Sequence, residues 1–142
     1  MRICKRKTNG EELACKTLPK KIEENVYKEI EIMQHLSGHP NVVTLRSVYE
    51  DVESLHLVME LCTGGCPTNE ISRTGRYSEH QATKFIKELI MVIKYYHELC
   101  VVHLDIKPEN VLRTNSKQLK LADFVLSMRF AKGICSCFGF AH

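Results

Sequence analysis

A polar loop between two short apolar runs is the most constraining feature of this 142-residue chain. Residues 101–102 and 111–112 are apolar pairs typical of short strands, and the loop between them carries Asp105, Lys107 and Asn110. These three residue types, with such short gaps between them, are unusual together by chance. The sequence therefore predicts a loop, held between short strands, whose polar side chains could carry chemistry.

Residues 13–61 follow a strand, helix, strand, strand pattern. Residues 13–18 form a short apolar run that Pro19 closes, and residues 55–61 alternate apolar and polar side chains, as a half-buried strand does. Residues 43–49 are expected to be its antiparallel neighbour, connected through residues 51–53. Between these strands an apolar stripe with helical spacing predicts a helix of about four turns, which ends at Gly38 and Pro40. The stripe consists of Ile22, Val26, Ile30, Met33 and Leu36.

The segment from Gly64 to Pro67 breaks this pattern and marks a boundary. Beyond it, Ser78 and Gln81 have the spacing of a capping box, which predicts the start of a long helix. Residues 119–122 form a further short strand. The chain thus divides into a small β-rich N-terminal part and a helix-led C-terminal part. The buried face of the long helix is expected to contain Ala82, Phe85, Leu89, Ile93, Tyr96 and Leu99.

The composition is that of a globular domain, with 44% hydrophobic and 26% charged residues. A formal charge of +3 is too mild to indicate binding to nucleic acid or to a membrane. The seven cysteines are expected to be reduced thiols, because neither Cys62 with Cys66 nor Cys135 with Cys137 fits a metal site. The basic start of the chain runs into two glutamates at residues 11–12, so no signal peptide is expected. We therefore expect a cytoplasmic protein, with the nucleus as the alternative.

Four pieces of the sequence follow the order found in eukaryotic protein kinases. They are Lys16 in an apolar strand, Glu29 in the next helix, the polar loop at residues 102–112, and Asp123-Phe124 after a further strand. With these pieces in this order, the chain strongly resembles a eukaryotic serine/threonine protein kinase domain. The resemblance implies an α+β, two-lobed fold that is incomplete in this chain. It divides the chain into a partial kinase domain at 1–129, comprising N-lobe 1–61, hinge 62–65 and the start of the C-lobe 66–129, and an unassigned tail at 130–142.

The resemblance also implies phosphoryl transfer from ATP, with Mg²⁺, to a protein hydroxyl. Lys16 matches the strand lysine that holds the ATP phosphates, and Glu29 matches the helix glutamate that pairs with it. Asp105 matches the catalytic base that orients the substrate hydroxyl. Asn110 and Asp123 match the two Mg²⁺ ligands, and such oxygen ligands are those that Mg²⁺ accepts.

Further matches concern specificity and the adenine site. Lys107 completes the Asp-x-Lys-x-x-Asn form of the serine/threonine branch, so the expected partner is a protein substrate with serine or threonine. Met59 matches the gatekeeper, and Glu60 to Cys62 match the hinge whose backbone reads adenine. His103 alone is expected to be a satisfied core histidine. Residues 13–16, 36–41 and 75–79 look nearest to plant calcium-dependent protein kinases and to kinases related to phosphoenolpyruvate-carboxylase kinase.

The chain also departs from the family pattern. It contains no glycine-rich phosphate loop, no Ala-Pro-Glu segment and no calcium-binding loop. Leu104 replaces the usual arginine, so control by a phosphorylated activation loop is not expected. Val125 replaces the usual glycine after Asp123-Phe124, and it is expected to disturb Asp123. Pro67 is expected to disturb the next short helix.

These departures leave two alternatives to an active kinase. One is a catalytically inactive kinase-like fragment that binds a partner or competes with an intact relative. The other is a truncated product without a stable fold. For the isolated chain we expect weak binding of Mg²⁺-ATP, an open apolar surface on the long helix, and no phosphate transfer.

Overall fold

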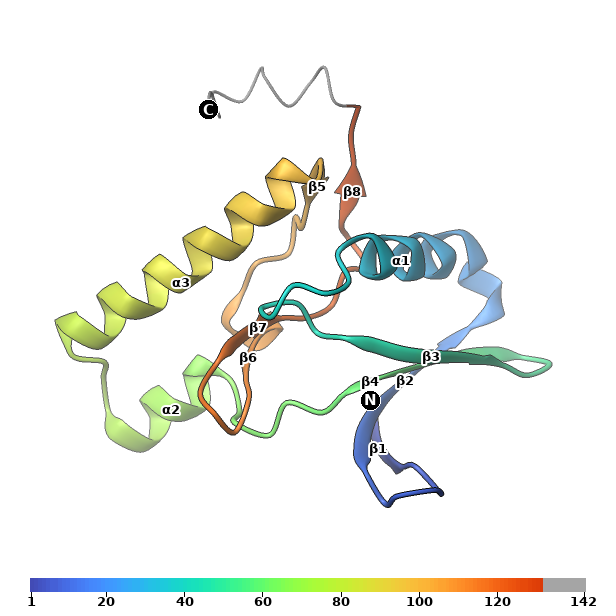
Figure 1. The fold of residues 1–142 in the computed structure, drawn as a ribbon, viewed down its shortest axis with the longest axis horizontal. Coiled ribbons are helices and arrows are strands. Elements are labelled where there is room, and N and C mark those ends of the chain that lie inside the picture. The colour runs from blue at the N-terminus through green and yellow to red at the C-terminus, as the bar shows by residue number, and fades with distance from the viewer. Residues whose placement is uncertain (132–142) are drawn as a thin grey trace.

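The computed structural model describes residues 1–131, and the N-terminal half of these is an antiparallel sheet with one helix (Figure 1). The strands lie in the order β1-β2-β4-β3, and each neighbouring pair is antiparallel. On β2 and β4, Ala14 lies opposite Met59 and Lys16 lies opposite Leu57, so these side chains share one face of the sheet. The elements are β1 (Arg2–Lys5), β2 (Glu12–Pro19), the 3₁₀ turn η1 (Lys20–Ile22), α1 (Glu23–His35), β3 (Leu45–Glu50) and β4 (Ser54–Glu60).

The predicted apolar patterns account for this half of the fold. The helix stripe and the alternating strand bury their apolar residues in one core, and the antiparallel pairing of β3 with β4 is confirmed. Each such side chain contributes about 1.5–3 kcal/mol when it is fully buried. The side chain of Ile22 lies outside the description. The shared core contains Val26, Met33, Leu36, Leu55, Leu57 and Met59.

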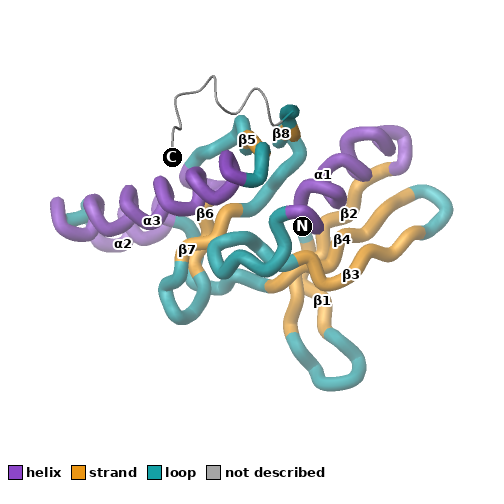
Figure 2. Tube along the Cα trace, turned by 45° about the horizontal axis from the view of Figure 1, so that its top comes forward, coloured by secondary structure: helices purple, strands orange, loops and turns teal. Residues whose placement is uncertain are grey.

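Within residues 61–131, two helices accompany two small two-stranded sheets. Figure 2 shows the β6–β7 hairpin lying between α3 and the N-terminal sheet, as does Figure 1. Two backbone hydrogen bonds join the hairpin to the N-terminal part, from Val43 N to Leu121 O at 3.2 Å and from Leu121 N to Asn41 O at 2.9 Å. The elements are α2 (Pro67–Thr74), α3 (Glu79–Glu98), β5 (Val101–Val102), the 3₁₀ turn η2 (Pro108–Asn110), β6 (Val111–Arg113), β7 (Leu119–Leu121) and β8 (Met128–Arg129).

The two helices of this part begin in different ways. The predicted capping box is confirmed: Gln81 N donates to Ser78 Oγ at 3.2 Å, and Ser78 N donates to Gln81 Oε1 at 2.9 Å. The expectation that Pro67 disturbs α2 is wrong. Pro67 is the first residue of that helix, where its missing N–H has no partner to lose and its fixed φ suits the first turn. Gly75, with φ of 86°, ends the same helix.

The buried face of α3 agrees with the prediction only in part. Tyr96 is buried as predicted, and Val92, which was not predicted, is the other buried residue. The remaining predicted residues are partly covered: Ala82, Phe85, Leu89, Ile93 and Leu99. Val92 and Tyr96 both enter the main core. On the other side of the helix Ile90 is 57% exposed and Met91 is 67% exposed, so an apolar surface is open, as expected from the sequence.

The predictions for the tail mostly lie outside the described part. Residues 132–142, which include Cys135 and Cys137, are not described. Within residues 1–131 no two cysteines are joined by a disulfide. In the same part of the chain, none of the helices combines the length and the apolar character needed to cross a membrane.

Candidate functional site

The side chain of Lys16 joins three elements that are far apart in the sequence. Its Nζ lies 2.8 Å from Glu29 Oε1 on α1 and 3.0 Å from Asp123 Oδ1, which follows β7. On β2, Lys16 lies two residues from Ala14 and therefore on the same face of the strand. Ala14 is buried, and this face is the one turned toward α1. The structure thus brings together three residues that the sequence assigned to one site.

The Lys16–Glu29 pair is well shielded from water. The Glu29 side chain is only 2% exposed, and its second oxygen, Oε2, is buried without a hydrogen-bond partner in the described part of the chain. Burial raises the pKa of Glu29, and the hydrogen bond from Lys16 lowers it in part. The ammonium of Lys16 is therefore the main group that favours the charged form of this carboxylate.

Asp123 is held in place by the residue that follows it. Its φ is 63°, in the left-handed region, while Phe124 is almost fully buried. The Phe124 ring lies 5.1 Å from the His103 ring and 5.8 Å from the Tyr96 ring, measured between centroids. Packing of this kind can hold a strained backbone, and such backbones are common at functional sites.

Val125 was expected to affect the placement of Asp123 on Mg²⁺, and this stays a prediction, but the contact of Asp123 with Lys16 is present with valine at position 125. The left-handed conformation falls on Asp123, and Val125 is not among the non-glycine residues of 1–131 with positive φ. A β-branched side chain is therefore tolerated at position 125, and Asp123 still reaches Lys16.

The polar loop predicted at residues 102–112 forms a second cluster. Asn110 Nδ2 donates to Asp105 O at 2.8 Å and to Asp105 Oδ2 at 2.9 Å, and Lys107 Nζ lies 2.8 Å from the same carboxylate oxygen. The hydrogen bond from Lys107, with a smaller effect from Asn110, lowers the pKa of Asp105. Asp105 therefore stays ionised at neutral pH.

His103 has the structural role that we expected for it. Its Nε2 lies 3.1 Å from the Ala122 carbonyl, which can only accept, so Nε2 carries the hydrogen. Its Nδ1 accepts from Asp105 N at 3.3 Å. Burial lowers the pKa of His103, and the neutral ring links the Asp105 loop to the strand that leads to Asp123.

The two clusters are neighbours. Ala122 N donates to Asn110 O at 3.0 Å, which places Asp123 directly beside the loop. The negative charge of Asp123 also contributes to the raised pKa of Lys107, after the larger effect of its hydrogen bond to Asp105. One site therefore contains a lysine–glutamate pair, two aspartates and an asparagine.

The predicted hinge residues do not all face this site. Met59 is buried and lies on the same face of the sheet as Lys16. Glu60, one residue further along β4, points to the opposite face, where its carboxylate lies 2.6 Å from Lys120 Nζ. Cys62 is half-buried, and burial raises the pKa of its thiol to about 11. Any contact of Glu60 with a nucleotide would therefore come from its backbone.

The oxygen atoms of the site suit a magnesium ion. Within residues 1–131, the side-chain hydrogen bonds of these two residues use Asn110 Nδ2 and Asp123 Oδ1, which leaves Asn110 Oδ1 and the second oxygen of Asp123 without a partner there. Amide and carboxylate oxygens, together with phosphate, are the ligands that Mg²⁺ prefers. The described residues hold no cluster of three or more histidine, cysteine or acidic residues that would suit another metal.

The sequence did not point to two features of this structure. One is the ion pair between Glu60 and Lys120, which looks in the sequence like two separate charges on exposed strand positions. The other is a pocket of about 510 Å³ behind the hinge, lined partly by Arg113. An alternation of charged and apolar residues at 119–121 was the only signal for the inward-facing Lys120, and it is equally typical of a half-exposed strand.

Comparisons with known proteins identify similar sequences. Residues 1–138 match the protein kinase domain family. Serine/threonine-protein kinase PEPKR2 of Arabidopsis thaliana is 59% identical over 133 residues, which cover 94% of this chain and 28% of that protein. Calcium-dependent protein kinase 12 of the same plant is 46% identical over 135 residues, covering 89% of this chain and 28% of the relative. Calcium-dependent protein kinase SK5 of Glycine max is 43% identical over 143 residues, which cover 94% of this chain and 28% of that protein.

The chain thus spans little more than a quarter of the length of these curated relatives. They are the kinds of protein that the motifs predicted. None of the comparisons supports the alternative of an inactive binding fragment.

Proposed function

Because this chain belongs to the protein kinase family, we propose that the protein containing it transfers the γ-phosphate of ATP to serine or threonine hydroxyls of protein substrates. The observation that carries the proposal is the contact of one lysine ammonium with both Glu29 and Asp123, beside the Asp105 loop. Kinase catalysis rests on positioning and on neutralising charge, and these groups supply both.

Lys16 is proposed to bind the α- and β-phosphates. Its ammonium is fixed by Glu29 at 2.8 Å, and a fixed cation loses little freedom when an anion binds. Met59, on the same face of the sheet, would line the adenine side of the site, and the backbone of residues 60–62 would supply hydrogen bonds to the base.

Asp105 is proposed to accept a hydrogen bond from the substrate hydroxyl and to orient it for attack. Lys107 and Asn110 keep its carboxylate ionised and restrict its rotation, at 2.8 and 2.9 Å. Lys107 would also lie close to the transferred phosphate. Its presence supports serine and threonine over tyrosine as acceptors, in keeping with the relative PEPKR2, a serine/threonine-protein kinase.

Asn110 and Asp123 are the residues that would hold Mg²⁺, through the oxygens that remain without protein partners. The ion neutralises charge on the phosphates when it is bound. Asp123 is suited to this role because its side chain is 41% exposed, whereas its backbone is held by buried Phe124.

We also propose that the protein is cytoplasmic, with the nucleus as the alternative. The support is limited to the sequence, in which glutamates at residues 11–12 interrupt the basic N-terminal segment. A fluorescent fusion expressed in plant cells tests the proposal. Signal confined to the secretory pathway or to an organelle would contradict it.

Phosphate transfer tests the proposed activity. The protein is expressed from its full transcript, and transfer from γ-labelled ATP to casein is compared between the parent and Asp105→Asn. The variant should lose about a hundredfold or more in rate, the usual contribution of a positioned acid–base group. Asp51→Asn, an exposed change in the β3–β4 turn, is the matched control and should retain full activity. A parent that transfers nothing, or an Asp105→Asn variant as fast as the parent, would contradict the proposal.

A further inference from the structure

The pocket behind the hinge is separate from the site described above. It lies between α2, α3 and the turn that joins β6 to β7, and its volume is about 510 Å³. Volumes of this size are typical of pockets that bind ligands or peptide side chains. Lys16, Asp105 and Asp123 do not line it.

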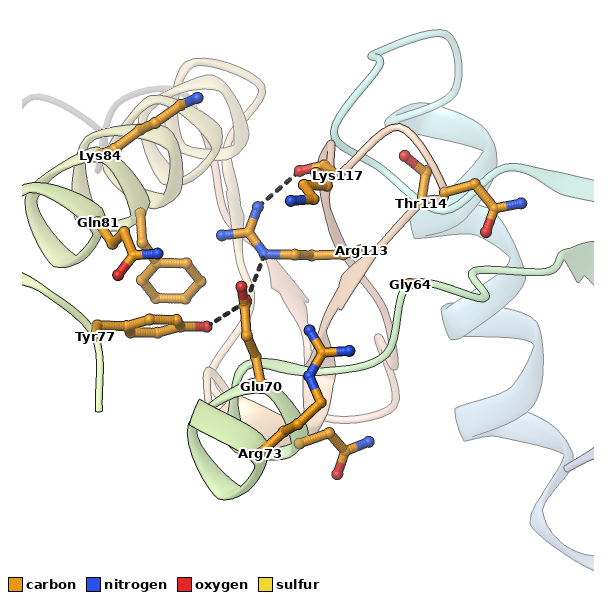
Figure 3. Close-up of a pocket in the computed structure, with 12 residues that line it drawn as sticks. Gly64, Glu70, Arg73, Tyr77, Gln81, Lys84, Arg113, Thr114 and Lys117 are labelled. Carbon is orange, nitrogen blue, oxygen red and sulfur yellow. Dashed lines mark hydrogen bonds and ion pairs between the residues drawn. The ribbon is translucent and has the colours of Figure 1, made fainter. Parts of the chain in front are cut away.

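The pocket concentrates positive charge. Four cationic side chains line it, against the single carboxylate of Glu70. Figure 3 shows that they come from different elements: Arg73 from α2, Lys84 from α3, Arg113 from β6 and Lys117 from the following turn. The side chains of Arg73, Lys84 and Lys117 are exposed, and none of the ion pairs within residues 1–131 includes them.

Arg113 is the least exposed of these four cations, and some of its N–H groups have no hydrogen-bond partner in the described part of the chain. Its side chain is 16% exposed, and one N–H donates to the Lys117 carbonyl at 2.7 Å. Its approaches to Glu70 and Glu88, at 3.8 and 3.9 Å, are longer than hydrogen bonds, and its Nε has no hydrogen-bond partner in the described part of the chain. A guanidinium has five N–H donors, so Arg113 can still bind a carboxylate that enters the pocket.

Two aromatic side chains form the floor of the pocket, and both already contact other residues. Arg113 covers the Phe85 ring at 5.6 Å from its centroid, and Tyr77 donates its hydroxyl to Glu70 at 2.8 Å. The face of Phe85 under Arg113 is therefore not available for stacking a nucleic-acid base, the contact that single-strand binding uses. The polar side chains around the floor, such as Asn69 and Thr114, can instead pair with the backbone of a peptide.

From this charge distribution we propose that the pocket binds an acidic segment of a partner protein, with its glutamate and aspartate side chains directed at Arg73, Lys84, Arg113 and Lys117. The rim cations provide long-range attraction, and Arg113 provides a fixed inner contact. The proposal does not depend on kinase activity, because the groups involved are distinct from those of the phosphate site.

Fluorescence anisotropy with a defined peptide tests this surface. The probe is a short labelled peptide rich in glutamate and aspartate with two leucines, and its control has glutamine and asparagine in place of the acids. The 142-residue chain should bind the acidic peptide, and binding should weaken as salt increases, since the contacts at the rim are exposed. The neutral peptide should not bind measurably.

Two double variants with the same change in net charge make the test specific. Lys84→Glu with Lys117→Glu should lower the affinity for the acidic peptide at least about fivefold, because each exposed charge contributes a modest attraction that becomes a repulsion. Lys7→Glu with Lys28→Glu, at exposed positions on the β1–β2 turn and on α1, should change it less than about twofold. No binding by the parent, equal binding of the neutral peptide, or an equal loss in both double variants would overturn the proposal.

Discussion

Replacing Lys120 by methionine should destabilise the chain strongly, although the residue lies outside the proposed catalytic machinery. The Lys120 side chain is only 9% exposed, and its Nζ lies 2.6 Å from Glu60 Oε1. The same oxygen accepts from Thr44 N at 2.6 Å. Lys120 is on β7 and Glu60 is on β4, so the pair holds the small hairpin against the N-terminal sheet.

The size of the expected destabilisation depends on the unpaired charge that the substitution leaves on Glu60. Breaking a buried pair by removing one partner typically costs about 3–5 kcal/mol, because the remaining charge is unpaired. Glu60 is 19% exposed and keeps its bond from Thr44, so we expect a smaller loss of about 2–3 kcal/mol in the free energy of unfolding. That is a large part of the total stability of a domain of this size, about 5–15 kcal/mol.

The destabilisation caused by Lys120→Met should depend on pH in a defined direction. Burial raises the pKa of Glu60, but the hydrogen bonds from Lys120 and Thr44 outweigh it, so the pKa lies below the ordinary value of 4.5. The pair therefore stabilises the parent above pH 4.5, and this stabilisation is lost as the pH falls through the lowered pKa. The destabilisation caused by Lys120→Met should accordingly shrink on acidification.

Urea unfolding, followed by circular dichroism at low protein concentration, measures the effect. Lys87→Met, at an exposed position on α3, is the matched control and should change the free energy by less than about 0.5 kcal/mol. Combining Lys120→Met with Glu60→Gln should cost less than the sum of the single changes, because no unpaired charge remains. Additive effects, or a Lys120→Met variant as stable as Lys87→Met, would show that the Glu60–Lys120 pair does not stabilise the fold.

Three further outcomes are expected. Ser78→Ala removes the cap of α3 and should lower the free energy of unfolding by about 1 kcal/mol in the same urea assay. His56→Ala should raise the pKa of Asp51 from about 2 toward 3.8 in an NMR titration, because His56 provides the largest effect that lowers it. In the parent, the hydrogen bonds to the ionised Asp51 carboxylate are fully present above pH 3.8 and are lost as the pH falls through about 2. Ile90→Lys should reduce self-association in size-exclusion chromatography, since Ile90 is 57% exposed on an apolar face.

Each of these outcomes can fail in a recognisable way. An unchanged urea midpoint for Ser78→Ala would mean that the cap contributes nothing. An Asp51 pKa that stays near 2 without His56 would assign the effect to the backbone N–H donors of the turn. Val52→Lys, at a 92% exposed position away from the apolar face, is the control for Ile90→Lys, and an equal effect of both would point to net charge alone.

The parts of the fold that were predictable from the sequence are those set by local pattern. The spacing of Val26, Met33 and Leu36 predicts α1 because a helix must bury one stripe. The capping box of Ser78 and Gln81 predicts the start of α3 for an equally local reason. The site residues were predictable through a family resemblance, and the structure brings Lys16, Glu29 and Asp123 together.

The errors concern features that depend on the environment of a residue. Val92 and Ile93 are neighbours on α3, and helical spacing alone accepts either; packing against the main core selects Val92. Pro67 breaks a helix in its interior but suits the first position, so the outcome depends on where the helix begins. The two-residue strand β8, which pairs with β5, is too short to leave a pattern.

Isothermal titration of the 142-residue chain with ATP, with and without Mg²⁺, tests the nucleotide and metal site most directly, in the parent and in Asp123→Asn. We expect weak, saturable binding by the parent that depends on Mg²⁺, because the chain contains the lysine and the oxygen ligands but no glycine-rich loop. Asp123→Asn leaves the Lys16–Glu29 pair intact and should abolish the Mg²⁺ dependence, whereas Asp51→Asn should behave as the parent. Binding that is the same with and without Mg²⁺, or unchanged in Asp123→Asn, would contradict the assignment of these residues to one nucleotide and metal site.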